Sequence, residues 1–258
     1  VPAEMFRVEY DLGEPAGGSR AFDLDKLNKY FVAFDIVDET HKADDDEWVF
    51  AEPDPSGTYA AGADWAKEQD KTVFRVVRTD VKPWRVVYLR HWNRRPWPTM
   101  IDAFNDLCIK YQAVSAHDAT GLGNVIHDMI DERTMKVVMI GRDRTNLLTE
   151  YITAVEQGVY QLPRNTPSFA SHKATTVEDV FAPGRWNSHL EDDVAAAAIC
   201  HRAAMRMAPA AAAQGVPKTE APKKDFEQFH AKPDVDVVYD VGGVRVQDMD
   251  EGIAVFNL

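Results

Sequence analysis

The sequence predicts a mixed α/β fold, in which an antiparallel three-strand meander and further parallel strands form one sheet flanked by helices. Three runs rich in β-branched, aromatic or small residues, Thr58–Ala63, Thr72–Arg78 and Trp84–Arg90, are joined by short connections, which favours antiparallel pairing. From Thr99 onward, helical and strand-like runs alternate, as they do between parallel strands. The chain has 258 residues, of which 45% are hydrophobic, and this is enough for one substantial core.

The residues before the meander have a different character. A helix is predicted over Phe22–Phe34, and an acidic stretch rich in turn formers follows and ends at Glu52–Gly57. We interpret residues 1–57 as a lead-in or linker, so that the main domain spans 58–208.

After the meander the periodicity becomes helical over Thr99–Tyr111, because apolar residues recur at intervals of three and four. A strand that ends at Asp118 comes next. The elements expected after it are a helix through Val125 and Ile130, a strand Lys136–Ile140, a helix Thr145–Gln157, extended pieces Tyr160–Pro163 and Thr175–Phe181, and a long helix Glu191–Met205.

The last part of the chain, 209–258, is predicted to be a linker followed by an extension. Ala210–Lys224 is rich in Ala, Pro and Lys, which is typical of linkers. Val235–Val246 has the pattern of a β-hairpin that turns at Gly242 and Gly243.

Composition limits the setting of the protein. No apolar run has the length of a membrane span and the chain starts without a signal-like segment, so we expect a soluble, intracellular protein. Cys108 and Cys200 lack the spacing of a zinc site and are predicted to be buried, reduced thiols rather than a disulfide.

The net charge of −13 argues against a nucleic-acid partner, because phosphate binding depends on Lys and Arg. The charge is uneven, however. Four arginines lie beside three tryptophans in one stretch and are DNA-facing candidates: Arg85, Arg90, Arg94 and Arg95. A solvated hairpin explains this stretch equally well.

Acidic residues lie where three predicted elements deliver side chains to one edge of the sheet. Asp64 ends the first meander strand, Asp118 ends the strand after the first long helix, and Asp192 and Asp193 begin the last long helix. Ligands of open α/β sheets gather beyond the carboxyl ends of strands, so these places can converge. Carboxylates from several elements suit Mg²⁺, and two such ions about 3.5–4 Å apart catalyse phosphodiester hydrolysis. The pattern indicates a metal-dependent nuclease.

Each aspartate also has an ordinary explanation. Asp64 and Asp118 suit the turns that follow strands, and acids are favoured in the first turn of any helix. On helical spacing Asp193 shares a face with Ala197 and Cys200, so it points inward more than Asp192 does. A buried carboxylate without a partner is costly, and this cost favours a ligand role for Asp193.

Three segments resemble, in order, the C-terminal nuclease domain of the large terminase subunit of tailed bacteriophages. They are Ala61–Trp65, His117–Asn124 and His189–Ala197, and the resemblance covers Thr58 to Met207. The Asp-Ala-Thr-Gly-Leu-Gly run that begins at Asp118 is the most specific part. The resemblance implies an RNase H-like fold that binds two Mg²⁺ or Mn²⁺ ions and cuts concatemeric double-stranded DNA during genome packaging.

Carried over by position, the resemblance makes Asp64, Asp118 and Asp193 the catalytic metal ligands, with Asp192 as a neighbouring ligand. The family often has His-Asp-Asp at the third site, whereas Leu190 and Glu191 separate His189 from the pair here. Further residues are candidates to support the ligands: Asp70, His117, Lys173 and His189.

The implied partners are double-stranded DNA, a portal protein, a small terminase subunit and an N-terminal packaging ATPase domain, and the implied location is the host cytoplasm. The sequence has no phosphate-loop motif, so we expect a fragment without ATPase activity. Two other functions stay open: an RNase H-like junction resolvase or recombination nuclease, and a non-catalytic module that docks on the portal.

Overall fold

The computed structural model describes residues 19–66, 71–120, 126, 129–181 and 189–206, and the backbone of 207, 238–241, 244–249 and 252–257. The chain divides into two compact units, Val1–Gln214 and Gly215–Leu258. The first unit contains the main sheet, and the second contains a three-stranded sheet of its own.

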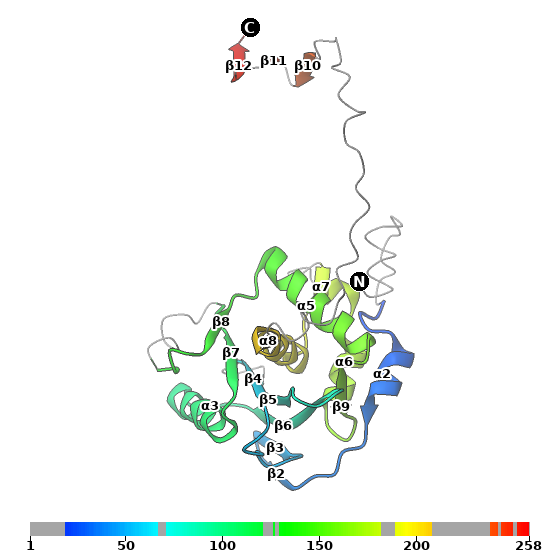
Figure 1. Cartoon of the computed structure of the whole chain (residues 1–258), viewed down its shortest axis with the longest axis vertical. Helices are drawn as coiled ribbons and strands as arrows, with labels where there is room; N and C mark the ends of the chain where they lie inside the picture. The colour runs from blue at the N-terminus through cyan, green and yellow to red at the C-terminus, as the bar shows by residue number, and fades with distance from the viewer. Residues whose placement is uncertain are drawn as a thin grey trace. The chain divides into compact units, whose positions relative to one another are not determined.

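The main sheet confirms the predicted mixture of antiparallel and parallel strands (Figure 1). Its central path runs β1-β9-β6-β5-β4-β7-β8. The strands of this path are β1 (Phe31–Val32), β4 (Tyr59–Asp64), β5 (Thr72–Arg78), β6 (Trp84–Trp92), β7 (Val114–Asp118), β8 (Met135–Val137) and β9 (Tyr160–Pro163). β4, β5 and β6 form the antiparallel meander, whereas β7 pairs parallel with β4, and β8 parallel with β7.

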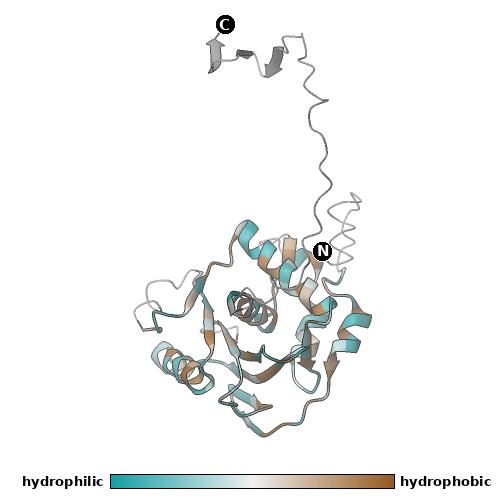
Figure 2. Cartoon of the chain, in the orientation of Figure 1, coloured by the Kyte–Doolittle hydropathy of each residue, from teal (hydrophilic) through white to brown (hydrophobic). Residues whose placement is uncertain are grey.

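Helices cover both faces of this sheet. α3 (Trp97–Tyr111) lies on one face, and α8 (Asp192–Met207) and α5 (Gly141–Glu156) lie on the other (Figure 1). Two separate apolar clusters fill the spaces between these layers. Helices such as α3 and α5 have a hydrophilic and a hydrophobic side, as expected for helices that cover a sheet (Figure 2).

The contact between α8 and β4 is unusually close because small residues line both elements. A Cβ atom added to Gly62 would lie only 2.4 Å from the backbone nitrogen of Cys200 and 2.7 Å from the carbonyl oxygen of Ala196. The alanines of the helix, Ala195 to Ala198, are all buried. The small-residue strand and the Ala-rich helix therefore determine where α8 crosses the sheet.

The described part of the region 1–57, residues 19–57, belongs to the first unit. The structure divides the chain between Gln214 and Gly215, a few residues after the predicted end of the main domain at 208. α2 (Leu24–Tyr30) is shorter than the predicted helix because Phe31 and Val32 leave it to pair with β9. The acidic stretch forms a hairpin, β2 (Asp38–Lys42) and β3 (Asp45–Val49), that pairs with β6. The mostly exposed β2 lacks the apolar alternation that would have predicted it.

The extended piece predicted at Thr175–Phe181 is wrong over most of its length. Residues Val177–Phe181 form α7, and α6 (Ser168–Ala174) precedes it. The Asp179 carboxylate accepts hydrogen bonds from the backbone N–H and hydroxyl of Thr176 at 2.7 and 2.8 Å, which caps the helix. This cap outweighs the strand preference of the two threonines. The helix predicted through Val125 and Ile130 lies mostly outside the described residues.

The second unit is a small antiparallel sheet of β10 (Val238–Val241), β11 (Val244–Met249) and β12 (Gly252–Asn257). The predicted hairpin is confirmed in β10 and β11, and its turn, Gly242 and Gly243, lies outside the described residues. In the first unit, both cysteines are free thiols. No helix among the described segments is long and apolar enough to cross a membrane.

Candidate functional site

Asp64 and Asp118 are neighbours at the ends of two adjacent parallel strands. In the pairing of β4 with β7, Ala63 lies opposite His117, so the next residue of each strand is one of the two aspartates. Alternate residues of a strand share a face. Gly62 and Ala116 both pack on the α8 side, so Asp64 and Asp118 also face that side. The structure thus brings these two predicted site residues together.

Asp118 has a local setting of its own. One of its carboxylate oxygens accepts a hydrogen bond from the backbone N–H of Thr120 at 2.8 Å. Burial raises the pKa of Asp118 from its ordinary value, and the Thr120 hydrogen bonds offset part of this effect. A neighbouring cation would favour the charged carboxylate.

The direction of α8 brings its N-terminus to the same edge of the sheet. The Cys200 thiol donates to the carbonyl of Ala60 at 3.4 Å, and Gly62 lies nearest to Ala196 and Cys200. The direction from Ala60 to Asp64 along β4 is therefore the direction from Cys200 toward the N-terminus of α8. Asp192 is the first residue of the helix and is partly exposed.

Asp192 is tied to the strand next to Asp64. Its carboxylate accepts the backbone N–H of Lys71 at 2.8 Å. Lys71 directly precedes β5, and in β5 it is Val73 that lies opposite Asp64. Asp192 therefore lies at the same edge of the sheet as Asp64 and Asp118, which we call the aspartate edge.

Asp193 points into the protein, as its helical position predicts, but its carboxylate is bound by other side chains. Its carboxylate forms a buried ion pair with Arg75, accepts the Ser168 hydroxyl at 2.8 Å and hydrogen-bonds to His91 Nε2 at 2.9 Å. Burial alone would raise the pKa of Asp193, but Arg75 and the His91 hydrogen bond hold it well below its usual range. These partners offset the cost of burial without a metal ion.

Aromatic and imidazole groups surround the Arg75–Asp193 pair. Arg75 also donates to the Tyr151 hydroxyl at 3.5 Å and to the Ser168 hydroxyl at 2.6 Å. His172 Nδ1 donates to the carbonyl of Ser168 at 2.7 Å, so its Nε2 accepts the Tyr151 hydroxyl at 2.7 Å. Burial and the nearby Arg75 charge lower the pKa of His172 to about 4. His172 is therefore neutral at pH 7.

The donor set at this edge suits a hard divalent ion. Asp64 and Asp118 supply carboxylate oxygens from neighbouring strand ends, and Mg²⁺ is commonly held by one or two carboxylates while it keeps several waters. Within the residues that the structure describes, no group of three or more His, Cys, Asp or Glu side chains is arranged to hold a metal. The fit is thus to an open site, in which carboxylates and waters share the coordination, rather than to a closed cage.

The candidates for supporting roles are dispersed. His117 is buried on the α3 side, where it accepts the Trp65 indole N–H at 3.2 Å, away from the face of Asp118. His189 is exposed and its backbone N–H donates to Asp179 at 2.9 Å. Lys173 is exposed on α6, and Asp70 lies outside the described residues.

The four arginine candidates divide into two groups. Arg90 is paired with Asp45 at 2.9 and 3.0 Å and stacks 3.6 Å above the Trp92 ring. Arg85 lies over Phe34 near the start of β6, at the edge opposite the aspartates. Arg94 and Arg95 follow the end of β6, at the aspartate edge.

The sequence analysis did not identify the three partners of Asp193, which are Arg75, His91 and Ser168. A signal was present for the first of them, because Arg75 interrupts the otherwise apolar centre of the run Thr72–Arg78. A fully buried arginine needs a buried acid, and Asp193 was the inward-facing acid. No pattern in the sequence pairs them, since 118 positions separate the two.

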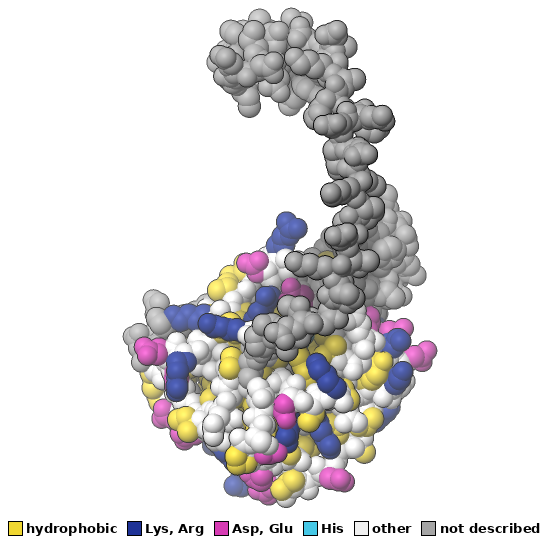
Figure 3. Space-filling model, in the orientation of Figure 1, with side chains coloured by type: hydrophobic (Ala, Val, Ile, Leu, Met, Phe, Trp, Pro, Cys, Tyr) yellow, Lys and Arg dark blue, Asp and Glu magenta, His cyan; other side chains and the backbone are white. Residues whose placement is uncertain are grey.

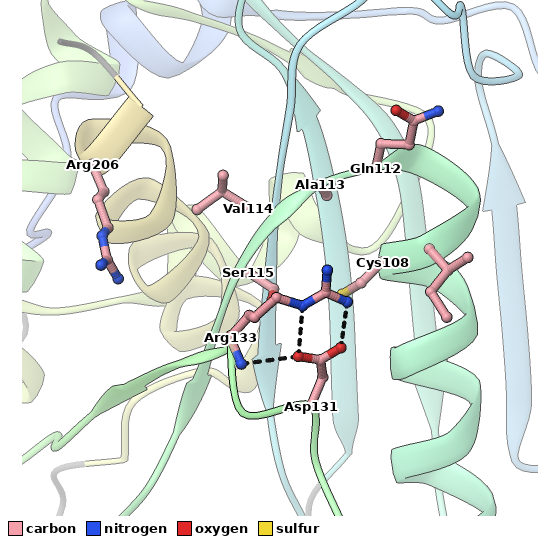
Figure 4. Close-up of a pocket in the computed structure, with 9 residues that line it drawn as sticks. Cys108, Gln112, Ala113, Val114, Ser115, Asp131, Arg133 and Arg206 are labelled. Carbon is pink, nitrogen blue, oxygen red and sulfur yellow. Dashed lines mark hydrogen bonds and ion pairs between the residues drawn. The ribbon is translucent and has the colours of Figure 1, made fainter.

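Two cavities lie at opposite ends of the sheet. A polar cavity of about 260 Å³ adjoins the aspartate edge and is lined by residues that include Lys71, His91, Asn93 and Asp192. A larger one, of about 800 Å³, lies between the end of α3 and the end of α8, where Arg133 is paired with Asp131 (Figure 4). The larger cavity is therefore remote from the aspartates.

Comparisons with known proteins show the fold. No protein-family model and no curated protein matches the chain. Among solved structures, the large terminase nuclease from thermophilic phage G20c with bound magnesium matches with a TM-score of 0.56 and 19% identity, over 73% of this chain and 98% of that one.

Another match is the large terminase nuclease domain of Thermus phage P74-26, with a TM-score of 0.51 and 18% identity over 68% of this chain and 92% of that one. The G20c nuclease has also been solved with bound zinc and with bound cobalt. The chain has the RNase H-like fold of these large terminase nuclease domains.

Proposed function

We propose that this chain is a metal-dependent endonuclease domain of a viral DNA-packaging terminase, and that it hydrolyses phosphodiesters of concatemeric double-stranded DNA. The observation that carries the proposal is the placement of Asp64 and Asp118 side by side at the ends of β4 and β7, with the start of α8 at the same edge. The fold shared with terminase nucleases supports it, as do the divalent ions named in the structures of the G20c protein.

In this proposal Asp64 and Asp118 hold Mg²⁺ or Mn²⁺, and Asp192 is the third carboxylate. Two bound ions would supply activation of a water molecule and stabilisation of the departing 3′ oxygen. Asp64 and Asp118 would orient that site from two rigid, hydrogen-bonded strands. Asp192 would approach from the helix, since the Lys71 N–H holds its carboxylate near the end of β4.

Asp193, the ligand that the sequence favoured, is a positioning residue in this proposal. Its carboxylate is held by Arg75, His91 and Ser168, which lie on β5, β6 and α6. These contacts fix the first turn of α8 against the sheet. Asp192, one residue earlier, is then directed toward the aspartate edge.

The biological setting follows the same proposal. The domain would act with an N-terminal packaging ATPase domain, a portal protein and a small terminase subunit in the host cytoplasm. The absence of ATPase activity from this chain stays a prediction, which metal-supplemented ATP hydrolysis assays can contradict.

The direct test is cleavage of supercoiled plasmid by the purified chain with Mg²⁺, Mn²⁺ or EDTA. We expect nicking and linearisation with either metal and none with EDTA. Asp64→Asn and Asp118→Asn should lower the rate by about 100-fold or more, because each removes a charged ligand. Glu132→Gln, which removes an exposed carboxylate at the opposite edge, is the matched control and should cut normally. Cleavage that persists in EDTA would refute the metal-dependent mechanism.

The roles of Asp192 and Asp193 can be separated in the same assay. We expect Mg²⁺ to raise the Tm of the wild-type chain, because an ion that binds only the folded state stabilises it. Asp192→Asn should lose both cleavage and this rise in Tm, while its metal-free Tm stays within a few degrees of wild type. Asp193→Asn should lower the metal-free Tm. If Asp192→Asn cuts plasmid at the wild-type rate, Asp192 is not the third carboxylate.

A further inference from the structure

Most of the arginines in the described part of the first unit are already engaged. Arg75, Arg78, Arg90, Arg133 and Arg202 form ion pairs, and Arg144 donates to the carbonyls of α7. The side chains of Arg20, Arg85, Arg94, Arg95, Arg142 and Arg206 differ, because the structure records no hydrogen bond or ion pair for them among the described residues. Of these six cations, Arg94, Arg95 and Arg142 follow elements that end beside the aspartates, where they are available to an external anion.

Arg94 and Arg95 lie on one side of the aspartates. They follow β6, whose residue His91 pairs with Val73, and Val73 also lies opposite Asp64. The N–H of Asn93 donates to the carbonyl of Asp44 at 3.0 Å, which fixes the start of this turn. Arg94 has a φ of +52°, a conformation that is uncommon for a residue other than glycine. The turn therefore presents both arginines at the aspartate edge.

Arg94 and Arg95 are near acids but are not neutralised by them. In the β2–β3 hairpin, the Asp45 carboxylate is bound by Arg90 and by the Trp92 indole. Arg90 thus takes up the charge of Asp45, whereas the exposed Asp44, whose carbonyl accepts the Asn93 N–H, adds a negative charge beside this turn. The net charge of −13 for the whole chain therefore does not give the local charge of this turn.

Arg142 lies on the other side of the aspartates. It is exposed in the first turn of α5, shortly after β8, and Val137 of β8 pairs with Asp118. The connection stays beside the end of β7, since the N–H of Met139 donates to the Thr120 hydroxyl at 2.7 Å. The start of α5 is therefore anchored near Asp118.

The two sides are separated by a distance that suits a nucleic-acid strand. From β6 to β8 the order is β6-β5-β4-β7-β8, and strands lie about 4.8 Å apart, which gives about 19 Å. At about 3.4 Å per nucleotide step, this spans about six phosphates of one DNA strand. On the face in Figure 3, basic side chains lie among acidic and apolar ones.

We infer that Arg94 and Arg95 on one side, and Arg142 on the other, bind backbone phosphates of duplex DNA on both sides of the phosphodiester that is cut. The inference rests on the proposed nuclease function. The arginines act as positioning residues, and they place the strand across the aspartates without reading its sequence. Arg85 and Arg90 have no part in this contact.

The test is equilibrium binding of a fluorescent linear duplex of about 30 base pairs over a series of salt concentrations, in EDTA so that no cleavage occurs. The logarithm of the association constant falls with the logarithm of salt concentration, by about 0.9 per phosphate contact. Arg94→Ala/Arg95→Ala should make this slope shallower by about two, and Arg142→Ala by about one.

The matched control is Arg85→Ala/Arg206→Ala, which removes the same charge from the opposite edge of the sheet, where Arg206 is also exposed. It should keep the slope within about half a unit of wild type. The inference is overturned if the Arg94/Arg95 double variant and this control have the same slope.

Plasmid cleavage separates this inference from the proposed function. With Mg²⁺, the Arg94/Arg95 double variant should need a higher DNA concentration for half-maximal rate while kcat stays near wild type. A chain that binds DNA with the expected slopes but does not cut it would support the phosphate contacts and refute the nuclease. A kcat that falls as far as the DNA affinity would overturn a purely positioning role.

Discussion

At the scale of single residues, adjacent positions of α8 have opposite environments. Successive helical residues are rotated by about 100° around the axis, so Asp192 lies at the edge of the sheet while Asp193 is buried. The buried position is stable because Arg75 supplies an opposite charge and Ser168 and His91 complete the hydrogen bonds. The pair is therefore a structural unit, and removing either member leaves a buried charge.

We expect Asp193→Ala to lower the free energy of unfolding by about 3–5 kcal/mol, because Arg75 would keep its charge in a buried site without its partner. Replacing both members, as Arg75→Met/Asp193→Leu, should recover much of that loss. Urea denaturation gives these values, and Asp192→Ala is the control, with an expected loss of about 1 kcal/mol or less for a partly exposed carboxylate. Equal losses for the two alanine variants would contradict the assignment.

At the scale of elements, the position of α8 depends on its contact with β4. Both elements lack bulky side chains at the contact, and the backbone of the helix approaches Gly62. This contact holds the start of α8 near the ends of β4 and β7. The geometry of the aspartate edge thus depends on a residue that has no side chain.

Gly62→Ala should destabilise the protein by about 1–3 kcal/mol or more, because the added methyl group would overlap the backbone of Cys200 and Ala196. The displaced helix should also reduce the rise in Tm that Mg²⁺ causes. Differential scanning calorimetry with and without Mg²⁺ measures both effects.

Gly141→Ala is the control for that prediction. Gly141 has a φ of +55° but no atom near an added Cβ, so its cost, about 1–2 kcal/mol, comes from backbone conformation alone. If Gly62→Ala leaves both stability and the Mg²⁺ effect unchanged, the close contact does not position α8.

At the scale of the whole molecule, neutral histidines are buried in the layer that contains α5, α6 and α8. Burial lowers the pKa of His172 and that of His201 to about 4. His201 Nδ1 hydrogen-bonds to the Tyr160 hydroxyl at 2.7 Å, and His172 bonds to Tyr151. Both pKa values lie below the unfolded value of about 6.5. The stability from these neutral histidines is present above pH 6.5 and is lost as pH falls toward 4.

We expect the protein to lose about 1.4 kcal/mol of stability per histidine for each pH unit between 6.5 and 4, in addition to the effect of carboxylates. His172→Gln should be less stable at pH 7 but should take up about one proton fewer on unfolding near pH 5. Urea denaturation at several pH values measures this slope. An unchanged slope would show that His172 is not a neutral buried group.

The local features of this protein can be predicted from its amino-acid sequence alone. The sequence predicted the meander, the helix after it, the strand ending at Asp118, the last long helix and the mixed sheet, because these depend on periodicity and turn residues close together in the chain. It also identified the aspartates at the ends of β4 and β7, since a residue that ends a strand has a fixed place at the edge of the sheet.

The pairings between residues far apart in the sequence are visible only in the folded structure. In it, residues 19–57 belong to the main unit, Asp193 pairs with Arg75, and Asp192 lies at the aspartate edge. It also separated Arg85 and Arg90 from Arg94 and Arg95. These outcomes depend on which charges meet inside the fold, and the partner of a buried charge is chosen by packing between elements rather than by the sequence around it.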